Sequence, residues 1–109
     1  MDEKAARRGE IAGLFDIYSP LLSERQQQAT EMYYIDDLSL SEISENLSIT
    51  RQGARSLVAR GVELLMFFED SLGFSRKENE ARSAAQKIKE CGVSGTALAE
   101  AEKILKLFG

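Results

Sequence analysis

The fold is limited most by the spacing of residues in one stretch, SLSEISENLSITRQGARSLVAR (residues 39–60). Ser39 is followed three residues later by Glu42. This is the spacing of a capping box, in which a hydroxyl and a carboxylate satisfy free backbone amides at a helix start. Ile43 and Leu47 then lie four residues apart and share one helical face. The pattern predicts a short amphipathic helix.

A second helix is expected after a tight turn. Thr50 carries the hydroxyl of a helix cap, and Ile49, in the turn, is expected to fill the space between the two helices. Apolar residues then recur at helical spacing and predict an inward face made of Ala54, Leu57, Val58 and Gly61. Two helices joined in this way form a helix-turn-helix, the unit that places its second helix in a nucleic-acid groove.

The outward face of the second helix carries arginines, a glutamine and hydroxyls, and no acid. Arginine and glutamine can read guanine and adenine edges through paired hydrogen bonds. The base-reading residues expected from this pattern are Arg51, Gln52, Arg55 and Ser56. The phosphate-contacting residues expected are Ser39, Thr50 and Arg60. The alternative is a helical hairpin whose arginines are only solvated, but the coincidence of cap, apolar spacing, turn and basic face favours nucleic-acid binding.

The same part of the chain resembles known families. The segments that carry the resemblance are LFDIYSPLLSERQ (residues 14–26), MYYIDDLSLSEIS (residues 32–44) and SITRQGARSLVARG (residues 48–61). They resemble region four of the bacterial sigma factors, which reads a promoter element, and still more the YlxM family of helix-turn-helix proteins of Gram-positive bacteria. The resemblance implies an all-α helix-turn-helix bundle of the sigma region-four type with a C-terminal helical extension. It also implies a connection to the signal recognition particle pathway and its GTPase.

Two positions depart from the family pattern. Ser44 stands where a small alanine is common, and Ser48 stands where glycine often forms the turn. A residue other than glycine is uncommon at positive φ. Ser48 is therefore the position at which the geometry of the turn is in question.

The segment before the motif predicts two supporting helices. The first is expected from Glu10 to the residues before Pro20, and residues 1–8 are expected to fray. Ser23 and Gln26 then predict a second capping box. The inner face of the helix that follows is expected to contain Ala29, Met32, Tyr33 and Ile35. Arg25 and the three glutamines after it are expected to form a solvated face, and the alternative is that they contact backbone phosphate.

The segment after the motif predicts one long helix and a helical hairpin. The second helix of the motif is expected to continue past Gly61 and to end at Ser71–Gly73. A polar helix over residues 74–90, a loop over 91–95 and an amphipathic final helix should follow. We therefore expect a domain at residues 1–72 and a hairpin at 73–109. The hairpin is expected to cover the apolar residues from Leu64 to Phe68 of its own or a second subunit.

Composition excludes several functional classes. The chain has 109 residues, no histidine and one cysteine, Cys91, so we expect no zinc site, no internal disulfide and a cytoplasmic location. Asp36 and Asp37 are adjacent and have no third partner, so we expect no catalytic site, no metal and no cofactor, and hence no enzyme. No apolar run is long enough for a membrane span, and the first ten residues are too charged for a signal peptide.

The net charge of −4 argues against indiscriminate binding to nucleic acid, so binding should be local and sensitive to salt. The expected partners are nucleic acid, with DNA favoured over RNA, components of the signal recognition particle, and a second copy in a homodimer. The competing hypothesis is a protein-interaction adaptor that uses the helix-turn-helix as a scaffold and an apolar C-terminal surface for binding. The acidic total and the large supply of apolar residues favour that alternative.

Overall fold

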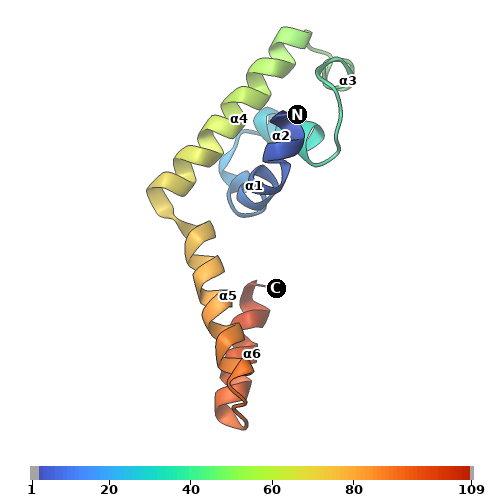
Figure 1. The fold of residues 1–109 in the computed structure, drawn as a ribbon. Helices are drawn as coiled ribbons and strands as arrows, with labels where there is room; N and C mark the ends of the chain where they lie inside the picture. The colour runs from blue at the N-terminus through green and yellow to red at the C-terminus, as the bar shows by residue number, and fades with distance from the viewer. Residues whose placement is uncertain (1–2, 109) are drawn as a thin grey trace. The chain divides into compact units, whose positions relative to one another are not determined.

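The structure is a computed structural model that describes residues 3–108, and over this range the chain is all-α, with helices and no strands (Figure 1). The chain divides into two compact units, Met1–Leu72 and Gly73–Gly109. Each unit has its own set of packed helices, so the two are described separately. The predicted all-α class is confirmed over the described range.

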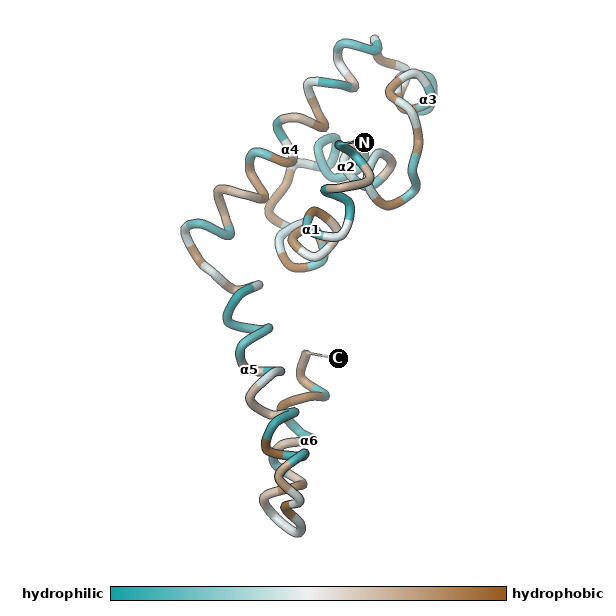
Figure 2. Tube along the Cα trace, in the orientation of Figure 1, coloured by the Kyte–Doolittle hydropathy of each residue, from teal (hydrophilic) through white to brown (hydrophobic). Residues whose placement is uncertain are grey.

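The first unit consists of four α-helices and one short 3-10 helix. In chain order these are α1 (Glu3–Tyr18), η1 (Ser19–Leu21), α2 (Glu24–Tyr34), α3 (Leu40–Leu47) and α4 (Arg51–Leu72). The first three α-helices all pack against the long α4 (Figure 1). Their shared core contains Ile11 from α1, Ile43 from α3 and Leu65 from α4, each 0% exposed. Hydrophobic residues become frequent toward the end of α4 (Figure 2).

The helices begin where their sequence caps predict. Ser39 Oγ accepts a hydrogen bond from the Glu42 amide at 3.1 Å, and Glu42 Oε1 accepts one from the Ser39 amide at 2.9 Å. The second predicted box, at Ser23 and Gln26, is formed in the same way at 3.2 and 3.0 Å. Thr50 Oγ1 accepts from the amide of the third residue after it at 2.9 Å. The three predicted caps are therefore confirmed.

The amino-terminal part of α1 corrects the expectation that residues 1–8 fray. The helix begins at Glu3, and the two residues before it lie outside the described range. Lys4 Nζ donates to the Leu38 carbonyl at 2.9 Å and lies 3.1 Å from Asp37 Oδ1. The same ammonium lies 4.0 Å from the centre of the Tyr33 ring. Because these contacts fasten α1 to the segment between α2 and α3, the expectation was wrong for residues 3–8.

The closest approach of α2 and α4 is at Thr30 and Gly61. Thr30 is completely buried, and a Cβ atom at position 61 would overlap its Oγ1. The buried face of α2 also includes Ala29 and Tyr34, whereas Ile35 is 37% exposed. The expectation that Ile35 lines the inner face was wrong because α2 ends at Tyr34, and the helical spacing does not extend past it.

The far end of α1 is held to the second half of α4 by Tyr18. This tyrosine is 1% exposed, and its hydroxyl donates to Glu69 Oε1 at 2.7 Å. Its ring lies 6.0 Å from that of Phe68, in a tilted arrangement. The pairing gives the buried hydroxyl a charged acceptor, which is the arrangement that buried tyrosines favour.

The second unit is a hairpin of α5 (Phe74–Glu90) and α6 (Thr96–Phe108) (Figure 1). Both helices were predicted, and the turn between them contains Gly92 and Gly95 at positive φ. The only buried side chains among the described residues of this unit are Ala85 and Ala101. Much of α5 is hydrophilic (Figure 2), so the hairpin has a thin core. That it covers Leu64 to Phe68 stays a prediction.

Candidate nucleic-acid interface

The turn between α3 and α4 is made by a serine in a backbone conformation that favours glycine. Ser48 has φ 55° and ψ 47°, and its amide donates to the Glu45 carbonyl at 3.3 Å. The next amide, of Ile49, donates to the Ser44 carbonyl at 3.0 Å. The turn therefore keeps the left-handed geometry without glycine, and Ile49 packs against the core, as predicted.

Arg25 supports the turn from α2, which the sequence analysis missed. Its Nη1 donates to the Leu47 carbonyl at 3.1 Å, at the carboxyl end of α3. A cation there is favourable because the last carbonyls of a helix are unsatisfied and carry partial negative charge. The two residues are 22 positions apart, so no local spacing in the sequence indicates the bond.

All seven predicted nucleic-acid residues are exposed, and six of them belong to α4 or to the residue before it. Five are side chains of α4 itself, namely Arg51, Gln52, Arg55, Ser56 and Arg60. Thr50 precedes the helix, and Ser39 precedes α3. The hydroxyls of Thr50 and Ser39 already accept backbone amides. The Thr50 hydroxyl keeps its own hydrogen to donate, whereas the Ser39 hydroxyl also hydrogen-bonds to the Glu42 carboxyl, a bond that a phosphate would have to replace.

Arg51, Gln52 and Arg55 are brought together on one surface. With Leu40 they line a hollow of about 320 Å³ beside the start of α4. Within residues 3–108 neither arginine takes part in an ion pair. The first turn of α4 also has no acidic side chain. Since the amino end of a helix carries partial positive charge, this surface attracts anions.

Arg60 differs from the other two arginines. Its Nη1 lies 2.9 Å from Glu63 Oε1, one turn further along α4. The sequence analysis described the outward face as free of acids and did not include this neighbour. Both side chains are more than half exposed, so the pair is screened by solvent and contributes little to stability. It nevertheless reduces the positive charge available at this end of the face.

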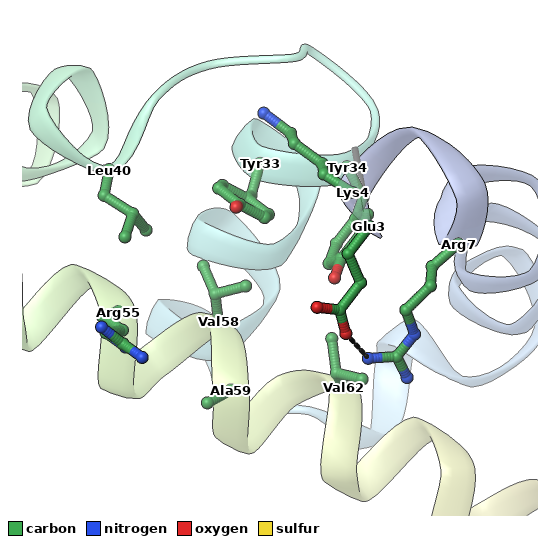
Figure 3. Close-up of a pocket in the computed structure, with 10 residues that line it drawn as sticks. All are labelled: Glu3, Lys4, Arg7, Tyr33, Tyr34, Leu40, Arg55, Val58, Ala59 and Val62. Atoms are coloured by element: carbon green, nitrogen blue, oxygen red, sulfur yellow. Dashed lines mark ion pairs between the residues drawn. The ribbon is translucent and has the colours of Figure 1, made fainter. Parts of the chain in front are cut away.

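A second and larger cavity lies on the side of Arg55 that faces α1, and Figure 3 shows the residues around it. It has a volume of about 520 Å³ and is formed by four helices of the first unit. The lining residues are Glu3, Lys4, Arg7, Tyr33, Tyr34, Leu40, Arg55, Val58, Ala59 and Val62. Burial raises the pKa of the Tyr34 hydroxyl, and the positive charge of Arg7 acts in the opposite direction. No local pattern in the sequence indicates this cavity, because its walls come from four separate helices, including the start of α1.

Among residues 3–108, the cysteine and the carboxylates form no metal-binding cluster. No group of three or more histidine, cysteine, aspartate or glutamate side chains among residues 3–108 is arranged to hold a metal ion. Asp37, at φ 58°, pairs with Lys4, and Cys91 is exposed beside the turn of the hairpin. None of the helices in that range is long and apolar enough to cross a bilayer.

The two capped helices joined at Ser48 form a helix-turn-helix, and a comparison with known protein families also indicates one. Residues 5–106 match the family model described as "UPF0122: Putative helix-turn-helix protein, YlxM / p13 like". The chain belongs to the UPF0122 family. The resemblance to YlxM proteins is thereby confirmed, and so is the expected helix-turn-helix fold.

Relatives in this family align with different fractions of the chain. A UPF0122 protein of Caldanaerobacter subterraneus is 45% identical over 78 residues, which are 72% of this chain and 67% of the relative. One from Fusobacterium nucleatum is 43% identical over 81 residues, or 74% of this chain and 79% of the relative. One from Acetivibrio thermocellus is 38% identical over 101 residues, or 89% and 86%. The chain thus spans about two thirds of the Caldanaerobacter relative and more of the other two.

Proposed function

We propose that this UPF0122 protein is a non-enzymatic regulatory protein that binds nucleic acid through the start of α4. The observation that supports this most directly is the shared surface of Arg51, Gln52 and Arg55. These side chains are exposed, they lie beside a helix start that lacks acids, and neither arginine has an ion pair in the described part of the chain. Such a surface has donors available for base edges and phosphates.

The residues of the surface would have two kinds of role. Arg51, Gln52, Arg55 and Ser56 would face base edges, as the side chains at the start of a recognition helix do. Thr50 and Ser39 would donate their hydroxyl hydrogens to phosphates, and Arg60 would pair with a phosphate in exchange for Glu63. We favour DNA over RNA, because the major groove of B-DNA admits an α-helix, whereas that of A-form RNA is too deep and narrow.

Charge and family likeness shape the expected partners. Residues 1–72 contain seven basic and thirteen acidic residues, so binding would depend on the local arginine surface and would weaken with salt. A homodimer would present two such surfaces to paired half-sites. The likeness to YlxM proteins supports components of the signal recognition particle as further partners. The unpaired Cys91 suits a reducing compartment, so we propose that the protein acts in the cytoplasm.

Replacement of Arg55 tests the proposal. A duplex selected from a random pool should bind the wild-type chain, and binding should weaken steeply between about 50 and 200 mM salt. Arg55→Ala should cost about 1–3 kcal/mol of specific binding, measured by mobility-shift titration. Lys103→Ala, which removes an exposed charge from α6, is the control and should bind as wild type does. Equal affinities for Arg55→Ala and wild type would rule out the assigned role of Arg55.

A second candidate function is that of a protein-interaction adaptor. The observation that favours it is the exposure of large apolar side chains, with Phe67 60% exposed in α4 and Leu107 73% exposed in α6. Isolated apolar residues are common on surfaces, so these two need not be a binding site. The adaptor hypothesis predicts no mobility shift at either salt concentration. It also predicts that a partner retained from a lysate stays bound after nuclease treatment.

A further inference from the structure

The cavity beside Arg55 has an apolar floor and cationic ends. Val58, Ala59 and Val62 of α4 form one side, and Tyr33 and Leu40 face them from α2 and α3 (Figure 3). Its volume of about 520 Å³ lies within the range of small-molecule sites, which are typically about 300–1,000 Å³ and mostly apolar with a few polar groups. The floor could therefore hold the apolar body of an organic molecule.

The cations around the cavity are not equally available. Lys4 is held by Asp37, by the Leu38 carbonyl and by the ring of Tyr33. Arg7 lies 4.0 Å from the carboxylate of Glu3 (Figure 3). Arg55, at the other end of the floor in this view, has no ion pair in the described part of the chain. An anionic group would thus meet least competition at Arg55.

We propose that this cavity binds a small organic anion, with its apolar body over Val58, Ala59 and Val62 and its anionic group at Arg55. The ligand class combines a compact apolar or aromatic body with one carboxylate, sulfonate or phosphate. Tyr34 completes the wall below Tyr33. Tyrosine hydroxyls are uncharged at neutral pH, and burial raises the pKa of Tyr34 further above its ordinary value. The tyrosines therefore add no negative charge that would repel the ligand.

Binding of the fluorescent probe anilinonaphthalenesulfonate to the full chain tests the site. The probe has aromatic rings and one sulfonate, so it should bind saturably, with one molecule per chain. Arg55→Gln should weaken binding about fivefold or more, because a charge-assisted hydrogen bond is lost. Arg51→Gln is the matched control. It removes the same charge one helical turn before Arg55, and Arg51 does not line this cavity.

A second pair of variants tests the floor. Ala59→Phe should fill the cavity and abolish probe binding. Ser56→Phe adds the same side chain to α4 outside the cavity and should leave the affinity for the probe unchanged. Probe bound to exposed apolar residues such as Phe67 would persist in Ala59→Phe. Undiminished binding in Ala59→Phe, or equal losses in Arg55→Gln and Arg51→Gln, would overturn the site. If Ala59→Phe does not fold, as judged by circular dichroism, the comparison of the two arginine variants decides.

Occupation of the cavity has a consequence that depends on the proposed function. Because Arg55 borders both this cavity and the hollow beside Arg51, a bound anion should compete with nucleic acid. Excess probe should release a bound duplex from the wild-type chain but not from Ala59→Phe. Probe binding without any release would reject this competition. A chain that binds no duplex would refute the proposed function, while the fluorescence titration would still decide whether the site exists.

Discussion

Gly61 is the residue on which the contact between α2 and α4 depends most directly. The two helices approach so closely there that a Cβ atom at this position would overlap Thr30 Oγ1, and it would lie 3.4 Å from Thr30 Cβ. Thr30 Oγ1 would have to move to make room, and Thr30 is completely buried in a closely packed interior. The glycine is therefore needed for space, because its backbone is helical and not left-handed.

Gly61→Ala should lower the free energy of unfolding by about 1–3 kcal/mol through overpacking, measured by urea denaturation. Gly13→Ala is the control, because nothing lies within 4 Å of a Cβ atom there and alanine is the better helix former. That control should gain about 0.5–1 kcal/mol. Adding Thr30→Ala to Gly61→Ala should recover part of the loss, and two additive effects would contradict the contact proposed here.

The Glu42 carboxyl makes the stability of the cap at the start of α3 depend on pH. Hydrogen bonding to the Ser39 amide, and next to the Ser39 hydroxyl, holds the pKa of the Glu42 carboxyl below its ordinary value of 4.5. A carboxyl whose pKa is lower in the folded state stabilises the fold above the unfolded pKa, and this contribution is lost as pH falls through the folded pKa.

Stability should therefore decrease as the pH is lowered from 4.5 through the folded pKa of Glu42. Glu42→Gln should show a smaller decrease over this interval, because the amide oxygen can still accept the Ser39 amide but does not titrate. Urea midpoints measured for both proteins from about pH 6 to about pH 2 provide the comparison. Parallel curves would show that Glu42 does not contribute to acid sensitivity.

At the scale of elements, the helix-turn-helix depends on a strained turn. Ser48 occupies the left-handed region, which costs residues other than glycine about 1 kcal/mol. Its backbone amide, and not its side chain, donates to the carbonyls of Glu45 and Ser44. Its side chain is exposed, so replacing it by glycine removes no buried contact.

Ser48→Gly should raise the free energy of unfolding by about 1 kcal/mol without changing the helix content, measured by thermal and urea denaturation. Asp37 offers a contrast, since it also has positive φ, at 58°, but pairs with Lys4. Asp37→Gly should gain less because it loses that pair. A lower stability of Ser48→Gly than of wild type would show that the serine hydroxyl has a role in the turn.

The sequence predicted the elements whose causes are local. The caps at Ser23, Ser39 and Thr50 and the helix Phe74–Glu90 follow from spacings of a few residues. The error at the start of α1 came from contacts between distant positions. Lys4 reaches Leu38 across 34 residues, and no local pattern shows that this contact orders the start of α1.

In the candidate site, too, features with local causes could be predicted and features made by distant residues could not. The exposure of Arg51 and Arg55 on α4 could be predicted, because arginines without a partner are rarely buried, even where they border buried residues such as Ala54 and Val58. The cavity beside Arg55 could not, because its walls come from four helices whose packing the sequence does not display. The bond between Arg25 and Leu47 was missed for the same reason.

At the scale of the whole molecule, the two units differ in how much core they contain. The first unit buries large side chains such as Tyr18, Ile11 and Leu65, whereas the described part of the hairpin buries only Ala85 and Ala101. A segment as short as residues 73–109 seldom buries enough surface to fold alone. The hairpin is therefore expected to depend on apolar contacts with another surface.

Separate fragments test this dependence. Residues 1–72 alone should unfold cooperatively on heating, whereas residues 73–109 alone should show little stable helix by circular dichroism. Mixing the fragments, or raising the concentration of the second, should restore helix if the missing surface is on the first unit or on another hairpin. A cooperative transition of the isolated hairpin at low concentration would contradict this prediction.

The positions of the tyrosines also determine what optical spectroscopy can report. All three, Tyr18, Tyr33 and Tyr34, belong to the first unit, and the chain has no tryptophan. Tyrosine emission therefore reports on the helix-turn-helix unit, while unfolding of the hairpin leaves it unchanged unless it disturbs that unit. Two melting curves, one from tyrosine and one from far-ultraviolet ellipticity, would coincide only if both parts of the chain unfold together.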